Sequence, residues 1–189
     1  MIDLAAGLAV VTDALDRADV RYVIVGSMAA SLWGVARTTR DIDLVLVLDP
    51  LVVDDVLALL ERDDVYVPID GAREALAHGG SFNVLHTTSG GKIDLFVVGP
   101  DDGFERSRLD RRVQADVLGL ASWVATAEDV ILAKLKWRLD SRSEVQWRDC
   151  VEIAAVQELD YAYLWRWAPV LGVVDDLTDL LGDGPPTSS

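Results

Sequence analysis

The stretch VGSMAASLWGVARTTRDID, residues 25–43, decides the fold that we expect for this chain of 189 residues. The β-branched run that leads into Gly26-Ser27 predicts a strand that stops at a tight turn. The small residues after the turn predict a helix, and a polar link then opens a second strand with Asp41 and Asp43 at alternate positions. The stretch therefore predicts a strand, a turn, a helix and an acidic strand in that order.

The two aspartates of the second strand form the centre of a candidate metal site. Residues two apart on a strand point to the same face, roughly 6.5–7 Å apart, so Asp41 and Asp43 place two carboxylates side by side. Phosphoryl-transfer enzymes use clustered carboxylates to hold two Mg²⁺ ions about 3.5–4 Å apart. Asp94, which lies between apolar neighbours in a later strand candidate, is the third carboxylate that we expect. Together the three predict a site for two Mg²⁺ ions.

The Gly26-Ser27 turn is a candidate binding site for the phosphates of a nucleotide. Free backbone N–H groups before a helix bind anions, glycine lets a phosphate approach closely, and Ser27 adds a hydroxyl donor. Arg40 is a further candidate for contact with nucleotide or acceptor phosphate. Taken singly, an Asp-x-Asp pair is more often a surface feature and a Gly-Ser turn more often a helix cap. Their order and spacing together are far more specific.

Local patterns along the chain predict one compact α+β body, a mixed sheet flanked by helices and followed by a C-terminal helical bundle. We expect a catalytic domain over residues 1–125, a helical region over 126–183 packed on it, and a disordered tail over 184–189. The predicted elements are a helix within 4–20, strands at 22–25 and 41–48, a helix over 50–62, strands at 82–87 and 92–98, and one or two strands within 115–124. Helices follow at 127–139 and 144–156, capped by Thr126 and Ser143, and near 164–171 in a segment that begins at Asp160.

The charge of the chain limits the partners that we expect. A net charge of −15 argues against broad nonspecific binding to nucleic acid, because such affinity comes mostly from neutralised phosphates. Basic residues are nevertheless concentrated in residues 104–148, and Arg108, Arg111 and Arg112 are candidates for a local nucleic-acid surface. Five tryptophans in apolar segments are expected to fill the core rather than to stack on bases. They are Trp123, Trp137, Trp147, Trp165 and Trp167.

Several classes of protein are excluded by the composition. No apolar stretch reaches the length of a bilayer-spanning helix, and the first twenty residues carry aspartates that a secretory signal would lack, so we expect a cytoplasmic protein without a membrane partner. Cys150 is the single cysteine and is expected inside a helix, and the two histidines lack a zinc-binding spacing. Neither GxGxxG nor GxxxxGK[ST] occurs, which argues against dinucleotide and P-loop sites.

Two groups of motifs resemble a known superfamily. Val25-Gly26-Ser27 with residues 37–43 resembles the signature of the polymerase-β-type nucleotidyltransferases, which implies a nucleotidyltransferase fold. Residues 127–134 and 146–149 resemble the lysine and Arg-Asp motifs of AbiEii-type toxins, including the MenT-like group. The resemblance implies that two residues from these motifs join the strand carboxylates as catalytic residues, one of them also binding the triphosphate. These two residues are Lys134, which would bind the triphosphate, and Asp149.

Other interpretations of the same residues stay open. Lys134 and Asp149 are also compatible with an exposed ion pair between consecutive helices. Arg37, beside the metal motif, suits either a phosphate contact or a solvated charge. In MenT-like relatives a hydroxyl residue in the place of Thr39 can be phosphorylated, which would put negative charge into a triphosphate site and block it. The resemblance therefore makes Thr39 a regulatory candidate.

The leading hypothesis is a Mg²⁺-dependent toxin of a toxin–antitoxin system. It would transfer a nucleotide from an NTP, with CTP as the family-based expectation, to the 3′ end of tRNA and so block translation, with a cognate antitoxin as partner. Nucleotidyl transfer follows from the motifs, whereas tRNA and the antitoxin follow from the resemblance alone. One alternative is a small-molecule nucleotidyltransferase of the aminoglycoside or lincosamide kind, which suits an acidic protein. The other is a catalytically silent nucleotide-binding antitoxin module, which the complete set of carboxylates disfavours.

Overall fold

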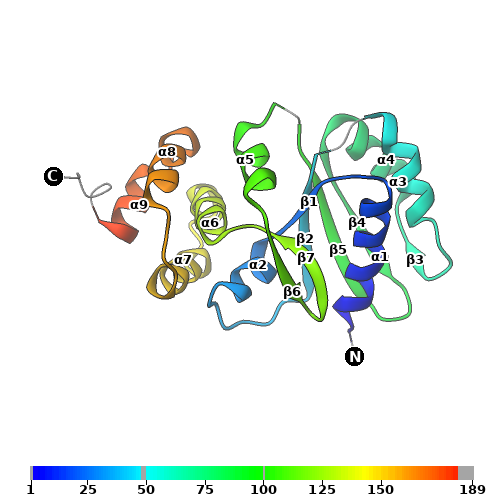
Figure 1. Ribbon diagram of the computed structural model, residues 1–189, viewed down its shortest axis with the longest axis horizontal. Helices are drawn as coiled ribbons and strands as arrows, with labels where there is room; N and C mark the ends of the chain where they lie inside the picture. The colour runs from blue at the N-terminus through cyan, green and yellow to red at the C-terminus, as the bar shows by residue number, and fades with distance from the viewer. Residues whose placement is uncertain (1, 48–49, 100, 183–189) are drawn as a thin grey trace. The chain divides into compact units, whose positions relative to one another are not determined.

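The computed structural model describes residues 2–47, 50–99 and 101–182, which form two compact units (Figure 1). The first unit holds the chain up to Met28 and from Thr38 to Ala125. The second unit holds Ala29–Arg37 and the chain from Thr126 onward. Within the described residues, every helix is too short or too polar to cross a bilayer.

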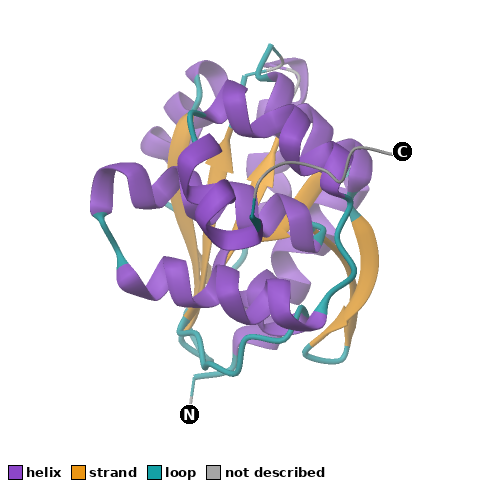
Figure 2. Cartoon of the chain, turned by 90° about the vertical axis from the view of Figure 1, so that its left-hand side faces the viewer, coloured by secondary structure: helices purple, strands orange, loops and turns teal. Residues whose placement is uncertain are grey.

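A mixed sheet of seven strands forms the first unit, and the strands lie side by side in one layer (Figure 2). Their order across the sheet is β3-β4-β5-β2-β1-β7-β6. The pairs β2–β5 and β1–β7 are parallel and the other pairs are antiparallel, so the predicted mixed sheet is confirmed. The strands are β1 Tyr22–Val25, β2 Asp41–Leu46, β3 Val65–Tyr66, β4 Gly80–His86, β5 Gly91–Val97, β6 Val113–Val117 and β7 Leu120–Val124.

The first residues of β2 and β5 alternate between polar and apolar side chains. Helix α1 packs against β5, and the residues of β2 and β5 that alternate with the polar ones, such as Ile42 and Ile93, are fully buried. The carboxylate of Asp3 begins α1 by accepting hydrogen bonds from the first backbone N–H groups. The helices are α1 Leu4–Arg17, α3 Val53–Leu60 after the 3₁₀ turn Pro50–Val52, α4 Ile69–His78 and α5 Gly103–Arg111, and α2 Gly26–Leu32 starts in this unit.

Helix α1 and strand β5 approach each other at backbone distance. A Cβ added to Gly91, the first residue of β5, would lie 2.5 Å from the carbonyl oxygen of Asp3. A Cβ added to Gly7 of α1 would lie 3.2 Å from the carbonyl oxygen of Gly91. The backbone N–H of Asp3 also donates a hydrogen bond to the carbonyl of Ser89, in the turn before β5. The start of β5 is therefore held tightly against the start of α1.

The second unit is helical, as the sequence predicts. Its helices are α6 Ala127–Ser141, α7 Glu144–Val156, α8 Tyr161–Leu171 and α9 Val174–Leu181. Thr126, Ser143 and Asp160 accept hydrogen bonds from the first turns of α6, α7 and α8, so the N-caps predicted at Thr126 and Ser143 are confirmed and Asp160 is a third. The buried carboxylate of Asp129 in α6 accepts a hydrogen bond of 2.6 Å from the hydroxyl of Tyr163 in α8. This bond fixes α8 to α6.

Some details differ from the sequence-based expectations. Trp137 is 65% exposed, so the expectation that all five tryptophans fill the core is wrong for this residue. The opening helix ends at Arg17 because Asp19 adopts a left-handed conformation with φ 56°. Strand β2 ends at Leu46, and the predicted tail over residues 184–189 lies outside the described residues. Helices α4, α5 and α9 and the two-residue strand β3 were not expected.

Candidate active site

The three predicted carboxylates lie on the polar face of two neighbouring parallel strands. Asp43 of β2 lies directly opposite Asp94 of β5, and Asp41 lies opposite Lys92. Neighbouring strands are about 4.8 Å apart, so the side chains of each opposed pair start close together. Asp43 also lies opposite Val25, the last residue of β1, and therefore beside the Gly26-Ser27 turn. The fold thus brings Asp41, Asp43 and Asp94 onto one face, as the sequence predicts.

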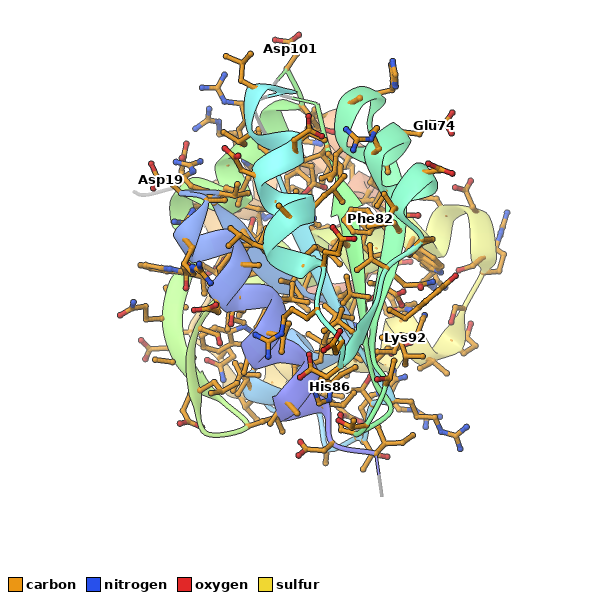
Figure 3. The ribbon with its side chains drawn as sticks, turned by 90° about the vertical axis from the view of Figure 1, so that its right-hand side faces the viewer. Asp19, Glu74, Phe82, His86, Lys92 and Asp101 are labelled. Carbon is orange, nitrogen blue, oxygen red and sulfur yellow. The ribbon has the colours of Figure 1, made fainter. Side chains whose placement is uncertain are left out.

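Lys92 lies within this group of carboxylates and was missed by the sequence analysis. Its Nζ atom donates a hydrogen bond of 2.6 Å to Oδ2 of Asp94; Figure 3 labels Lys92 on β5. The hydrogen bond to Asp94 raises the pKa of Lys92, burial opposes this rise, and the negative charges of Asp94, Asp41 and Asp43 reinforce it. A signal was present, because Lys92 stands two residues before Asp94 and strand alternation puts both on one face.

The side chains around the carboxylates have other partners in the structure. The hydroxyl of Thr39 donates hydrogen bonds to the backbone oxygen of Asp41 at 2.9 Å and to Oδ1 of Asp41 at 3.2 Å. Asp94 bonds Lys92. Across the described ranges, no three His, Cys, Asp or Glu side chains form a group that could hold a metal ion. Metal binding by the carboxylates therefore stays a prediction.

Gly26 has two structural reasons to be glycine. Its φ of +64° lies in the left-handed region, where a side chain is strained. A Cβ at this position would also lie 2.2 Å from Oδ2 and 3.1 Å from Cγ of Asp43. The sequence analysis expected the glycine to admit a phosphate, whereas the structure shows that it makes room for the carboxylate of Asp43. Ser27 follows in the first turn of α2, and Arg40 is exposed just before Asp41.

Lys134 and Asp149 form a buried ion pair inside the second unit. Nζ of Lys134 lies 2.7 Å from Oδ2 of Asp149 and also donates to Oε1 of Gln146 at 2.9 Å. The two side chains are only 6% and 4% exposed, so the alternative of an exposed pair between helices is wrong. Arg37 Nη1 lies 3.1 Å from the same oxygen of Asp149, so this side chain has an ion-pair partner although it is still 36% exposed. The roles of Lys134 and Asp149 in catalysis stay predictions.

The predicted basic surface is smaller than the sequence suggests. Arg108 is 4% exposed, and its Nη1 donates hydrogen bonds of 2.8 and 2.7 Å to the carboxylate of Glu105. The guanidinium of Arg112 stacks 4.6 Å from the centre of the Trp123 ring, and burial lowers its pKa. The prediction that Arg108 contacts nucleic acid is therefore wrong, because its charge is buried and paired.

Comparisons with known proteins define the fold. No protein-family model matches the sequence, and no curated protein matches it. An antigenic nucleotidyltransferase-like protein from Paracoccidioides brasiliensis matches with a TM-score of 0.55 and 20% identity, over 92% of this chain and 90% of that one. The structure of ANT(2'')-Ia in complex with adenylyl-2''-tobramycin matches with a TM-score of 0.56 and 15% identity, over 88% of this chain and 95% of that one.

A solution structure of the same protein, described as an antibiotic-resistance factor, matches with a TM-score of 0.52 and 16% identity, over 86% of this chain and 92% of that one. At these identities the similarity shows the fold. The chain has the α+β fold of nucleotidyltransferase-like proteins, as its motifs predict.

Proposed function

We propose that this chain is a Mg²⁺-dependent nucleotidyltransferase, which joins a nucleotide from an NTP to an acceptor hydroxyl and releases pyrophosphate. The observation that carries the proposal is the register that sets Asp43 opposite Asp94, with Asp41 on the same face. The Gly26 turn lies beside them, since Asp43 is also opposite Val25. The fold neighbours support the same class of activity.

Asp41, Asp43 and Asp94 are the residues that would hold Mg²⁺. Carboxylate oxygens are the ligands that this hard cation takes, and three of them on two neighbouring strands fit the donor chemistry. In the structure Oδ2 of Asp94 also accepts a hydrogen bond from Lys92. When bound, Mg²⁺ would activate the acceptor hydroxyl and neutralise charge on the triphosphate.

The protein's own groups would position the reactants. The acceptor oxygen forms a bond to the α-phosphorus, the bond to the bridging oxygen breaks, and the hydroxyl proton passes to a carboxylate or to water. Gly26, Ser27 and Arg40 are the proposed contacts of the triphosphate. Lys134 and Asp149 keep, as proposals, the catalytic roles that the resemblance implies, with Lys134 also binding the triphosphate.

The acceptor that we propose is the 3′ end of tRNA, with CTP as the nucleotide donor. This rests on the resemblance of residues 127–134 and 146–149 to the motifs of AbiEii-type toxins, and it makes the chain a toxin with a cognate antitoxin. Phosphorylation of Thr39 would add negative charge at a hydroxyl that bonds Asp41 and would oppose binding of a triphosphate. The proposal thus includes Thr39 as a regulatory residue.

A small-molecule acceptor is the second candidate. The complex of ANT(2'')-Ia contains adenylyl-2''-tobramycin and shares the fold over 88% of this chain. The net charge of −15 and the burial of Arg108 favour a small cationic acceptor over a large polyanion. The two candidates differ in the molecule that acquires the nucleotide.

The test is an incubation of the purified protein with Mg²⁺ and each labelled NTP in turn, with total tRNA in one set and tobramycin in the other. The Asp43→Ala variant is the control. Label on tRNA that disappears in the control supports the first candidate, and label on tobramycin supports the second. No label on either acceptor, with a folded protein, would contradict nucleotidyl transfer to these substrates.

A further inference from the structure

Lys92 lies among the proposed metal ligands, and the proposed reaction gives it no role. Its ammonium group donates to Asp94, and its neighbour across the parallel pair is Asp41. One positive charge thus stands among three carboxylates on the same sheet face. Carboxylates at this spacing repel one another, and the ammonium reduces that repulsion when no divalent cation is bound.

We propose that Lys92 is a built-in counter-ion that competes with the divalent cation for Asp94. This inference rests on the proposed metal role of the carboxylates. Oδ2 of Asp94 accepts the hydrogen bond from Lys92, so a metal ion bound to Asp94 would share this carboxylate with the ammonium group. A divalent cation bound to Asp94 would also repel the ammonium group of Lys92, which lies 2.6 Å from Oδ2 of the same carboxylate. Each cation therefore weakens the binding of the other, as reciprocal linkage requires.

The geometry makes this exchange easy. The side chain of Lys92 is 42% exposed, whereas that of Asp94 is 19% exposed. The flexible four-carbon stem of lysine lets the ammonium swing into water without moving the strand. Asp94, by contrast, stays on the sheet face beside Asp43. The competing group is thus the more exposed and more flexible partner of the pair.

The proposal has a consequence for which species the site accepts. A free divalent cation must displace Lys92 with its own charge alone. A cation that arrives bound to a triphosphate brings negative phosphate groups, which attract the released ammonium. The competition therefore disfavours loading of the free ion and favours loading of the metal–nucleotide complex.

The test measures Mn²⁺ binding by electron paramagnetic resonance, without nucleotide, for the wild type and five variants: two at Lys92, Asp94→Asn, the double variant Asp94→Asn/Lys92→Met, and Asp43→Ala. Lys92→Met removes the charge and keeps the length of the side chain, and Lys92→Arg keeps the charge as the matched control. We expect Lys92→Met to bind Mn²⁺ about fivefold more tightly, as an ion pair of this exposure warrants, and Lys92→Arg to stay within about twofold of the wild type. In an Asp94→Asn background, Lys92→Met should change the affinity by less than about twofold.

Thermal unfolding of the metal-free protein gives a second readout. Lys92→Met should unfold at a lower temperature than the wild type, and added Mn²⁺ should restore more stability to this variant than to the wild type. If Lys92→Met binds Mn²⁺ with unchanged or weaker affinity while Asp43→Ala abolishes binding, the metal site exists and the competition is refuted.

The remaining outcomes separate the inference from the proposed function. If neither the wild type nor any Lys92 variant shows Mn²⁺ binding that is lost on Asp43→Ala, both the proposed metal site and the role of Lys92 are refuted. Tighter binding by Lys92→Met in a protein that transfers no nucleotide would support the inference and count against the proposed function.

Discussion

Replacement of Gly26 by alanine separates the two reasons for a glycine at this position. The backbone reason is the φ of +64°, where an L-residue is strained by about 1–2 kcal/mol. Alanine also reduces the freedom of the unfolded chain, which returns about 0.4–1 kcal/mol. The net loss in the free energy of unfolding is therefore about 1 kcal/mol, or a fall of about 2–4 °C in Tm for a chain of this size.

The second reason concerns Asp43 and predicts a larger effect on the site. The added Cβ would lie 2.2 Å from Oδ2 of Asp43, about 1.2 Å short of the 3.4 Å at which ordinary contact begins. The carboxylate must therefore turn away, and metal sites tolerate ligand displacements of only about 0.2 Å. We expect Gly26→Ala to weaken Mn²⁺ binding by about tenfold or more.

Gly119→Ala is the matched control. Gly119 lies in the turn between β6 and β7 with φ +85°, and no atom lies within 4 Å of an added Cβ. This variant should lose a similar amount of stability and bind Mn²⁺ as the wild type does. Thermal unfolding and Mn²⁺ titration of both variants provide the two measurements. Wild-type Mn²⁺ affinity in a folded Gly26→Ala protein would refute the argument that the glycine serves the carboxylate.

Three further predictions concern stability. Asp149→Ala leaves the buried ammonium of Lys134 without its closest acceptor and should lower the free energy of unfolding, measured by urea titration, by about 3–5 kcal/mol. A loss under about 1 kcal/mol would contradict the buried ion pair. Tyr163→Phe removes the hydroxyl that donates to Asp129 and should lower the free energy of unfolding by about 1–3 kcal/mol. Tyr161→Phe, at an exposed position, is the control and should lower it far less. Equal losses would argue against the hydrogen bond between Tyr163 and Asp129. Burial raises the pKa of Cys150 to about 12, so the thiol ionises at a lower pH in the unfolded chain than in the folded one. The contribution of the thiol to the free energy of unfolding is therefore intact below pH 9 and falls as the pH rises from 9 towards 12. Stability should fall less steeply over this range in Cys150→Ala, and identical profiles would exclude the thiol as the cause.

The elements with strong local signals could be predicted from the sequence. The strand before Gly26, the acidic strand and the three capped helices of the second unit each carry an apolar period with a start or stop residue. Helix α4 lacks a side-chain cap, and α5 buries only Phe104, Arg108 and Leu109. Such elements depend on tertiary contacts, so local patterns could not reveal them.

The residues of the candidate site could be predicted from the sequence, but the strand register and the ion pairs that bring them together could not. Alternation puts Asp41 and Asp43 on one face, but the register that sets Asp43 against Asp94 depends on contacts across 51 residues of chain. Strand alternation could also have revealed Lys92 beside Asp94. The pairing of Arg37 with Asp149 joins residues 112 positions apart, and no local signal marks it.

The close contact between α1 and the first residue of β5 has a consequence for the timescale of events at the carboxylates. Because Gly91 and Asp3 touch through their backbones, β5 cannot slide along its neighbours without moving the first helix. Exchange at Asp94 is then left to the side chains, and rotation of an exposed side chain such as that of Lys92 takes picoseconds to nanoseconds. Movement of the Lys92 ammonium away from Asp94 is therefore far faster than typical enzymatic turnover, so the proposed competition would change how much metal is bound and not how fast the reaction runs.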